Sequence, residues 1–145
     1  RQVMVVKADA GIKVLADLAG KKIALQADSS ASEALDGKAD FKASIDGGAA
    51  VEYSDNMKAL LDLEIGGVDA VLMDEIVAGY YISQNNKPFV ILEEALADEE
   101  YGIGCRKGSE ALRDEIQLTL EAMAEDGTLA AISIKWFGKD LTTVK

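Results

Sequence analysis

Short apolar runs alternate with longer segments of mixed polarity along the first two thirds of the chain. The short runs, such as VMVVK and VDAVLM, have the length and the β-branched content of buried strands. The longer segments carry apolar residues at helical spacing, and several of them end at glycine, as helices often do. The predicted strands are 3–7, 22–26, 50–53, 68–73 and 88–92. The predicted helices are 12–20, 29–37, 54–67 and 75–85, with a loop over 41–50.

The pattern changes after residue 92. An acidic connector, 93–100, precedes a predicted sixth strand at 101–107. Two helices are predicted to finish the chain, at 109–127 and 128–138, because apolar residues recur there every three or four positions.

Strands that alternate with helices predict an α/β fold, in which a parallel or mixed sheet is flanked by helices. In such sheets ligands gather at the carboxyl ends of the strands, where loops lead into helices. Two segments of this chain meet that description, 25–33 and 72–75. They are the candidate ligand-binding segments.

The first candidate segment has two serines, Ser29 and Ser30, at the start of a predicted helix. The N–H groups at a helix start attract anions, including carboxylates. The alternative is that the serines only cap the helix, since Ser30 and Glu33 stand at capping-box spacing. The segment lacks the lysine and the repeated glycines of a phosphate-binding loop.

The second candidate segment ends a predicted strand with Asp74, whose carboxylate could hold an ammonium group. The alternative is that Asp74 caps the helix predicted at 75–85. Glu75 follows in the first turn, where the helix dipole favours an acid. A helix start that takes a carboxylate and an acid that takes an ammonium suit a zwitterion, so the two segments together point to amino-acid recognition.

Composition removes several classes of function. The chain of 145 residues has 26 acids, 15 bases and a net charge of −11, which argues against a nucleic-acid partner because phosphate binding needs clustered bases. It has no histidine, which excludes Ser-His-Asp triads and histidine-bound metals, and we predict no metal and no other cofactor. The single cysteine, Cys105, is interpreted as a core residue of the strand at 101–107. The chain begins directly on a strand without a signal-peptide pattern, which indicates a processed or truncated protein.

Three stretches of the sequence carry a family resemblance: DLAGKKIALQ, GGVDAVLMD and EDGTLAAISIKWFG. They resemble the extracellular amino-acid-binding proteins of ABC importers, which are type II periplasmic binding proteins for polar amino acids. The resemblance covers nearly the whole chain and implies two α/β lobes that close on a ligand about a hinge, without catalysis. It implies that residues 1–92 are the second lobe with the first crossing strand. Residues 93–145 would be the return segment and the C-terminal helices, and the N-terminal part of the first lobe is absent.

The resemblance also implies site residues. Asp74 matches the family acid that binds the α-ammonium group of the ligand. Ser29 and Ser30 match the residues that meet its α-carboxylate. Gln26 matches a position near the ligand side chain, and Met73, which precedes the acid, is expected to touch the ligand.

The resemblance leaves one departure and several alternatives. Asp28 stands where the family often has glycine, and its negative charge would oppose a carboxylate nearby. The implied partners are an amino acid and the membrane permease of an importer, and the implied location is the periplasm or, for a lipoprotein, the cell surface. Three alternatives stay open: a ligand-sensing domain of a membrane receptor, an enzyme of the same fold, or a lobe fragment that associates with itself by strand swapping. Which amino acid is bound also stays open.

Overall fold

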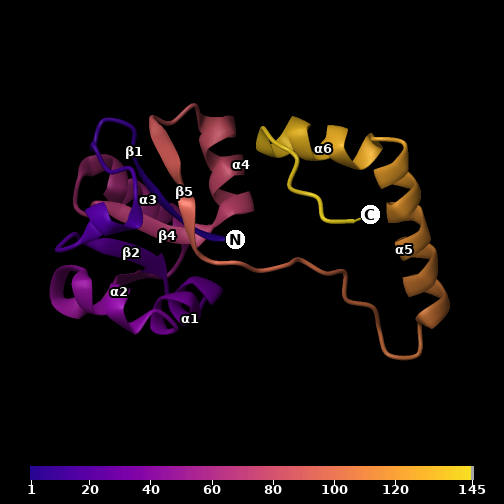
Figure 1. Cartoon of the computed structure of the whole chain (residues 1–145), viewed down its shortest axis with the longest axis horizontal. Helices are drawn as coiled ribbons and strands as arrows, with labels where there is room; N and C mark the ends of the chain where they lie inside the picture. The colour runs from indigo at the N-terminus through magenta and orange to yellow at the C-terminus, as the bar shows by residue number, and fades with distance from the viewer. Residues whose placement is uncertain (145) are drawn as a thin grey trace. The chain divides into compact units, whose positions relative to one another are not determined.

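The computed structural model describes residues 1–144. The chain divides into two compact units, Arg1–Glu99 and Glu100–Lys145, and each is described here by itself. Figure 1 labels their helices and strands. No helix of the described residues is long and apolar enough to cross a membrane.

The first unit is built on a mixed sheet of five strands in the order β3-β2-β4-β1-β5. Strand β2 pairs in parallel with β3 and with β4, whereas β1 runs antiparallel to both β4 and β5. The strands are β1 (Gln2–Lys7), β2 (Ile23–Gln26), β3 (Val51–Tyr53), β4 (Ala70–Asp74) and β5 (Phe89–Ala97). The five strands predicted before residue 93 and the α/β fold class are therefore confirmed.

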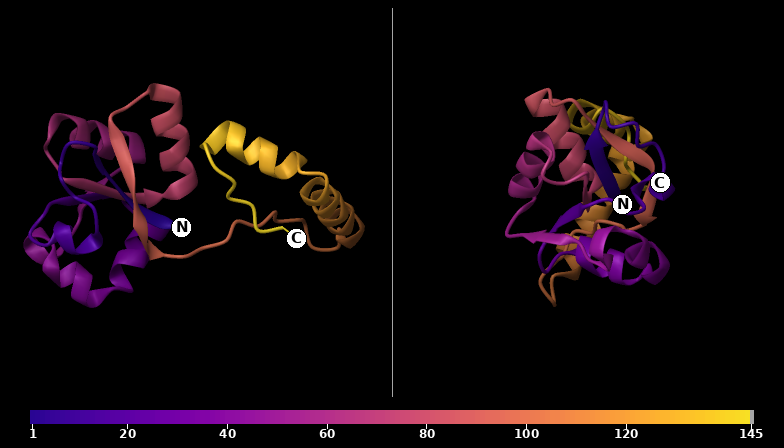
Figure 2. Two further views of the ribbon diagram at one scale, coloured as in Figure 1. Left: turned by 45° about the horizontal axis from the view of Figure 1, so that its top comes forward. Right: turned by 90° about the vertical axis from the view of Figure 1, so that its left-hand side faces the viewer.

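Helices cover both faces of this sheet (Figures 1 and 2). The helices are α1 (Ser30–Asp36), α2 (Ala39–Ser44), α3 (Asn56–Ile65) and α4 (Glu75–Asn85), with the short 3-10 helices η1 (Leu15–Leu18) and η2 (Asp46–Gly48). On one face Leu35 of α1 packs in a buried cluster with Leu72 of β4. On the other face Leu63 of α3 and Tyr81 of α4 pack in a cluster with Met73. Neighbouring residues of β4 thus face opposite sides of the sheet, as the pleat of a strand requires.

Two segments of the first unit differ from their predicted structure. The helix predicted at 12–20 is only the short η1, which holds Leu18 in the core. The loop predicted at 41–50 contains the end of α2 and the whole of η2. Both segments contribute buried residues to the cluster that packs against α1. This burial holds the segments in a defined conformation, although their sequences lack the apolar spacing of a long helix.

Strand β5 continues through the segment predicted to be an acidic connector. Val3 and Val5 of β1 lie opposite Ala95 and Ile91, which are four positions apart, so β5 bulges between them. The acids at 93–94 lie in this bulge and are exposed to solvent. The strand therefore continues beyond the two acids that interrupt its apolar pattern, and the compact unit that contains it extends to Glu99.

Helix α3 is capped by Asp55. The Asp55 Oδ1 atom accepts a hydrogen bond of 2.9 Å from the backbone N–H of Lys58. This bond lowers the pKa of Asp55 from its ordinary value, and its ionised form is therefore stabilised by folding. The stabilisation is present above the ordinary pKa of aspartate and is lost as pH falls through the lowered pKa.

Replacement of Asp55 by alanine should therefore lower the urea midpoint of unfolding, because an N–H group of α3 loses its side-chain acceptor. Ser54→Ala is the matched control and should lower the midpoint much less, because the Ser54 hydroxyl contacts the exposed side chains of Asp55 and Lys58 and no N–H group of the helix. Unfolding at neutral pH and again below the pKa of aspartate checks the cause, since the difference between Asp55→Ala and the natural chain should shrink in acid. Equal effects of the two substitutions would contradict the assignment of the cap.

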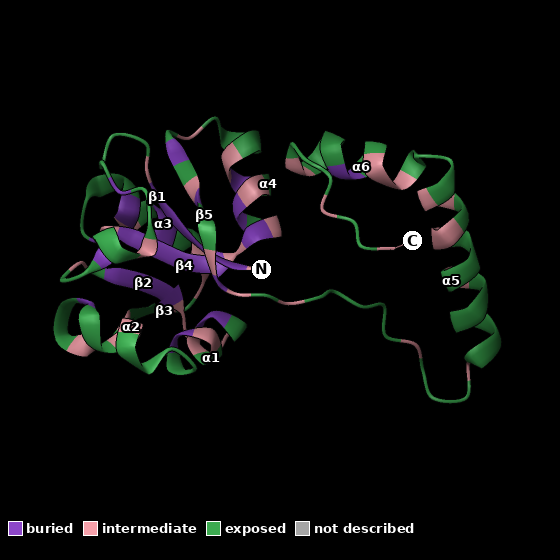
Figure 3. Cartoon of the chain, in the orientation of Figure 1, coloured by how far each residue is buried: buried purple, intermediate pink, exposed green. Residues whose placement is uncertain are grey.

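The second unit contains the two helices predicted from the sequence, α5 (Glu110–Glu125) and α6 (Thr128–Phe137). The strand predicted at 101–107 is wrong, because those residues form no strand. A strand needs the backbone of a neighbour, and no strand of the described chain pairs with this segment. Cys105 is accordingly half-exposed and not a core residue. Most of the unit is exposed (Figure 3), and of residues 100–144 only Ser133 is buried.

Candidate functional site

The two candidate segments lie at the same edge of the sheet. Gln26 ends β2 and Asp74 ends β4, and these strands are parallel neighbours, so their carboxyl ends meet. Strand β1 runs the other way, which places its first residue, Gln2, directly opposite Asp74. The structure therefore brings Gln26 and Asp74 to one edge and adds Gln2, which sequence reasoning missed.

The two serines lie at the start of α1 but do not form the predicted capping box. Ser29 is the N-cap residue, and its Oγ donates to the carbonyl oxygen of Gln26 at 2.6 Å instead of accepting from the helix. Ser30 is already helical, and its Oγ accepts a hydrogen bond of 3.0 Å from Nε2 of Gln2. Within the described residues, the side chain of Ser29 therefore accepts no hydrogen bond from an N–H group of α1.

The backbone conformation of Asp28 explains why glycine suits this position in the family. Asp28 has a φ of 54°, a left-handed conformation that glycine adopts without strain and that aspartate tolerates better than most residues. The residue is exposed to solvent, where its charge is well screened.

Asp74 has the capping role that sequence reasoning offered as the alternative. It is the N-cap residue of α4, and its Oδ1 accepts from the backbone N–H of Val77 at 2.9 Å. Asp74 also interacts with the carboxyl group of Glu99, whose pKa it raises. Capping therefore engages one oxygen of Asp74 and does not account for the rest of its surroundings.

Glu99 is the second acid of this edge, and the acidic run at 93–100 concealed it in the sequence. The hydrogen bond with Asp74 is the largest cause that raises the pKa of Glu99, and burial raises it further. Gln2 opposes this by donating from Nε2 to Oε1 of Glu99 at 2.9 Å. The negative charge of Asp74 therefore favours the protonated form of Glu99 over its ionised form.

Gln2 joins the two candidate segments. Its Nε2 group reaches both Ser30 and Glu99, and Glu99 in turn reaches Asp74. The side chain is only 2% exposed, and its Oε1 has no hydrogen-bond partner in the part of the chain that the structure describes. The only sequence signal that could have identified Gln2 as a site residue was its polar side chain at the start of an apolar strand. This signal is weak because strand ends are often polar.

Glu75 has a further partner besides the helix dipole. Its carboxylate is 4% exposed and forms two hydrogen bonds with the guanidinium of Arg1, of 2.8 and 2.9 Å. The contact with Glu75 raises the pKa of Arg1. This pair ties β1 to the first turn of α4 beside Asp74, so it supports the site without being part of it.

Met73 does not join the other predicted site residues. It is 1% exposed and belongs to the cluster packed under α3 and α4. Asp74 follows it on the strand and therefore faces the opposite side of the sheet. The contact with a ligand that we expected for Met73 has no support in this geometry, because the pleat directs its side chain into the core.

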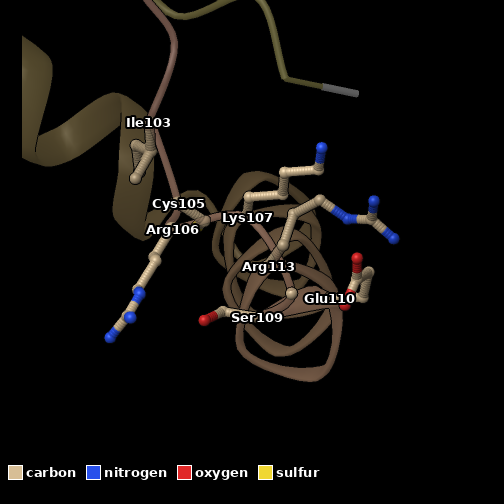
Figure 4. A pocket seen from close by; sticks show the side chains of 8 residues that line it. Ile103, Cys105, Arg106, Lys107, Ser109, Glu110 and Arg113 are labelled. Carbon is tan, nitrogen blue, oxygen red and sulfur yellow. The ribbon is translucent and has the colours of Figure 1, made fainter.

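A pocket lies elsewhere, in the second unit, at the start of α5 (Figure 4). It is lined by Ile103, residues 105–110 and Arg113. Its basic side chains spread outward, with Arg106 pointing away from Lys107 and Arg113. None of the predicted site residues lies in it. Residues 1–144 contain no group of three or more acids or cysteines that could hold a metal ion.

Comparisons with known proteins identify the family of this chain. Residues 1–139 match the family model of bacterial extracellular solute-binding proteins, family 3. The chain is 33% identical to the L-cystine-binding protein TcyJ of Escherichia coli (strain K12) over 97% of its length and 51% of that protein. It is 34% identical to the L-cystine-binding protein TcyA of Bacillus subtilis (strain 168), over 98% of this chain and 51% of that one.

A solved structure agrees with these relatives. The crystal structure of a polar amino acid ABC uptake transporter substrate-binding protein from Streptococcus thermophilus superposes with a TM-score of 0.79 at 31% identity. The match covers 99% of this chain and 55% of that one, so the chain spans about half the length of the proteins it matches. The resemblance seen in the sequence is thereby confirmed, and the chain belongs to the bacterial extracellular solute-binding proteins of family 3.

Proposed function

We propose that this chain forms the second lobe (residues 1–92) and the return segment with the C-terminal helices (residues 93–145) of the solute-binding component of an ABC importer. We propose that this component captures a polar amino acid. The observation that carries the proposal lies at the carboxyl edge of the sheet, where Gln2 is directly opposite Asp74 and donates from Nε2 to both Ser30 and Glu99. Ser30, at a helix start, is suited to a carboxylate, and Asp74 is suited to an ammonium group. Membership of the family and the names of the relatives also support capture of an amino acid.

Each residue has a role in this proposal. Asp74 binds the α-ammonium group, and its cap bond to Val77 holds the carboxylate in place. The amides and hydroxyls of Ser29 and Ser30 meet the α-carboxylate. Gln26, half-buried at the end of β2, lies beside the ligand side chain. Met73 has no role, because it lies in the core.

The proposal places the rest of the site on the other lobe of the protein, the first lobe. Closure of two lobes on a ligand is stabilised only by contacts that the ligand makes with both of them. The component would bind without chemical turnover outside the cytoplasm, in the periplasm or at the cell surface, and would deliver its ligand to the membrane permease. The relatives are transport proteins and do not favour the alternative of a receptor domain. Strand-swapped association of the isolated chain stays a prediction.

Thermal unfolding with added L-cystine, L-glutamine, L-histidine or L-arginine tests this function. The full-length protein that contains this sequence should be stabilised by at least one of the four, by about 2.7 kcal/mol at a hundred times the dissociation constant. Residues 1–145 alone should show little or no shift, because half of the contacts are missing. N-acetyl derivatives, which lack the ammonium charge, are the matched control ligands and should have no effect.

Two results would contradict the proposal. A full-length protein that none of the four amino acids stabilises would rule out capture of these polar amino acids. Micromolar binding by residues 1–145 in calorimetry would show that the first lobe is not needed.

A further inference from the structure

Alternate residues of β1 face helix α1. Met4 and Val6 pack in one buried cluster with Leu35 of α1. Gln2 stands two positions before Met4, so its side chain points to the same face of the sheet. The row of side chains that supports α1 thus begins with a buried amide, at a position where an apolar residue would continue the pattern.

Both hydrogens of the Gln2 amide nitrogen are used. Nε2 donates to Oγ of Ser30 at 3.0 Å and to Oε1 of Glu99 at 2.9 Å. The residue is only 2% exposed, whereas its Oε1 has no hydrogen-bond partner in the described residues. A buried acceptor without a donor is costly and rare in folded proteins. The amide therefore keeps one orientation although that orientation leaves its oxygen unsatisfied.

The opposite orientation of the amide shows what is maintained. A rotation by half a turn would place Oε1 against Ser30 and Glu99, and the Ser30 hydroxyl could then donate to it. The same rotation would bring oxygen against oxygen at Glu99, because an ionised carboxyl group only accepts hydrogen bonds. Glu99 therefore holds the nitrogen of Gln2 toward Ser30.

This orientation determines the direction of the Ser30 hydroxyl. A hydroxyl has one hydrogen and two lone pairs, and the Gln2 donor engages a lone pair. The hydrogen of the hydroxyl must then point away from Gln2. Ser30 is exposed to solvent, so this hydrogen can reach an acceptor outside the lobe. Carboxylate oxygens form the stronger bonds with such a donor, because the acceptor is charged.

We propose that Gln2 is a positioning residue that makes Ser30 a hydrogen-bond donor to the α-carboxylate of the amino acid. The inference rests on the proposed function, which assigns Ser30 to that carboxylate, and adds a buried residue that acts through Ser30. Without Gln2 the hydroxyl can rotate toward other acceptors. The ligand then binds more weakly, because binding must also fix the hydroxyl.

A double-mutant cycle in the full-length protein tests this coupling by calorimetry. The titrant is whichever of L-cystine, L-glutamine, L-histidine and L-arginine gives the largest thermal shift. Ser30→Ala removes the hydroxyl and should raise the dissociation constant about tenfold. Gln2→Met, an apolar replacement of similar length, should raise it by about three- to tenfold. In the Ser30→Ala background, Gln2→Met should change it by less than about twofold, because no hydroxyl remains to be oriented.

The stability of the unliganded protein separates positioning from a structural role. Gln2→Met removes a buried acceptor that lacks a donor, and its former partners Ser30 and Glu99 are accessible to water. The urea midpoint of unfolding should therefore not fall although affinity does. Gln2→Leu, a second apolar replacement, should give the same pattern. Gln84→Met is the matched control at an exposed position of α4 and should change neither affinity nor midpoint.

The outcomes are distinguishable. An unchanged dissociation constant in Ser30→Ala or in Gln2→Met would overturn the inference while leaving amino-acid binding intact. So would an equal loss of affinity from Gln2→Met with and without the Ser30 hydroxyl, which together with a lower midpoint would assign Gln2 a structural role. A protein that binds none of the four amino acids would overturn the proposed function as well.

Discussion

Asp74→Asn should nearly abolish amino-acid binding by the full-length protein. The substitution keeps the shape of the side chain and removes the negative charge that the ligand ammonium meets. Loss of one partner of a desolvated, hydrogen-bonded charge pair costs about 2–5 kcal/mol, because the other charge stays buried without compensation. The dissociation constant measured by calorimetry should therefore rise by about 30-fold or more.

Asparagine is chosen because it also caps helices well. It can accept the hydrogen bond from Val77 that Asp74 accepts now, so α4 should keep its start and the unliganded protein its stability. Asp55→Asn makes the same chemical change at the cap of α3, where the acid accepts from Lys58, and should not alter affinity. Full affinity in Asp74→Asn would show that Asp74 is only a cap. A loss of equal size in Asp55→Asn would show that the effect is structural.

Leu72→Ala should be among the most destabilising single changes in the first unit. Leu72 lies on β4, the central strand of the sheet, is 0% exposed and packs beneath α1. Removal of three carbon groups from such a position loses their burial and leaves a cavity, at a cost of about 2–5 kcal/mol. Urea unfolding followed by far-UV circular dichroism should show the transition of the first unit at a much lower midpoint.

Leu61→Ala is the matched control for this core substitution. Leu61 lies on α3 and is 52% exposed, so little burial is lost, and alanine favours a helix. Its free energy of unfolding should change by less than about 0.5 kcal/mol. Similar losses in the two variants would contradict the assignment of β4 to the centre of the core.

The sequence predicted the first unit well wherever burial requires apolar residues at a regular spacing. Helix α4 was predicted with its exact bounds and strand β4 to within two residues, because the helix begins at an aspartate cap and the strand is buried on both faces. Prediction failed where the structure depends on a partner distant in the sequence. The bulge of β5 exists because β1 lies beside it, and the segment at 101–107 has apolar residues but no strand to pair with.

The site was predicted only in part, for a similar reason. Asp74, Ser29 and Ser30 stand next to helix starts, which local sequence reveals. Gln2 and Glu99 do not, because they reach the site through the antiparallel register of β1 and the path of the chain after β5. Met73 was expected at the site because it precedes Asp74, but neighbours on a strand point to opposite faces.

The position of β1 inside the sheet has a consequence for how this lobe folds. The strand that is made first lies between β4 and β5, and β5 is made last of the five, at residues 89–97. At a synthesis rate of about 5–20 residues per second, β1 waits roughly 5–20 s for its second neighbour. Until then one hydrogen-bonding edge of an apolar strand is uncovered, which is the condition under which strands of separate molecules pair and aggregate. Folding of this lobe is therefore governed by contacts between the ends of the unit, and we expect it to be slow and to begin only when the unit is nearly complete.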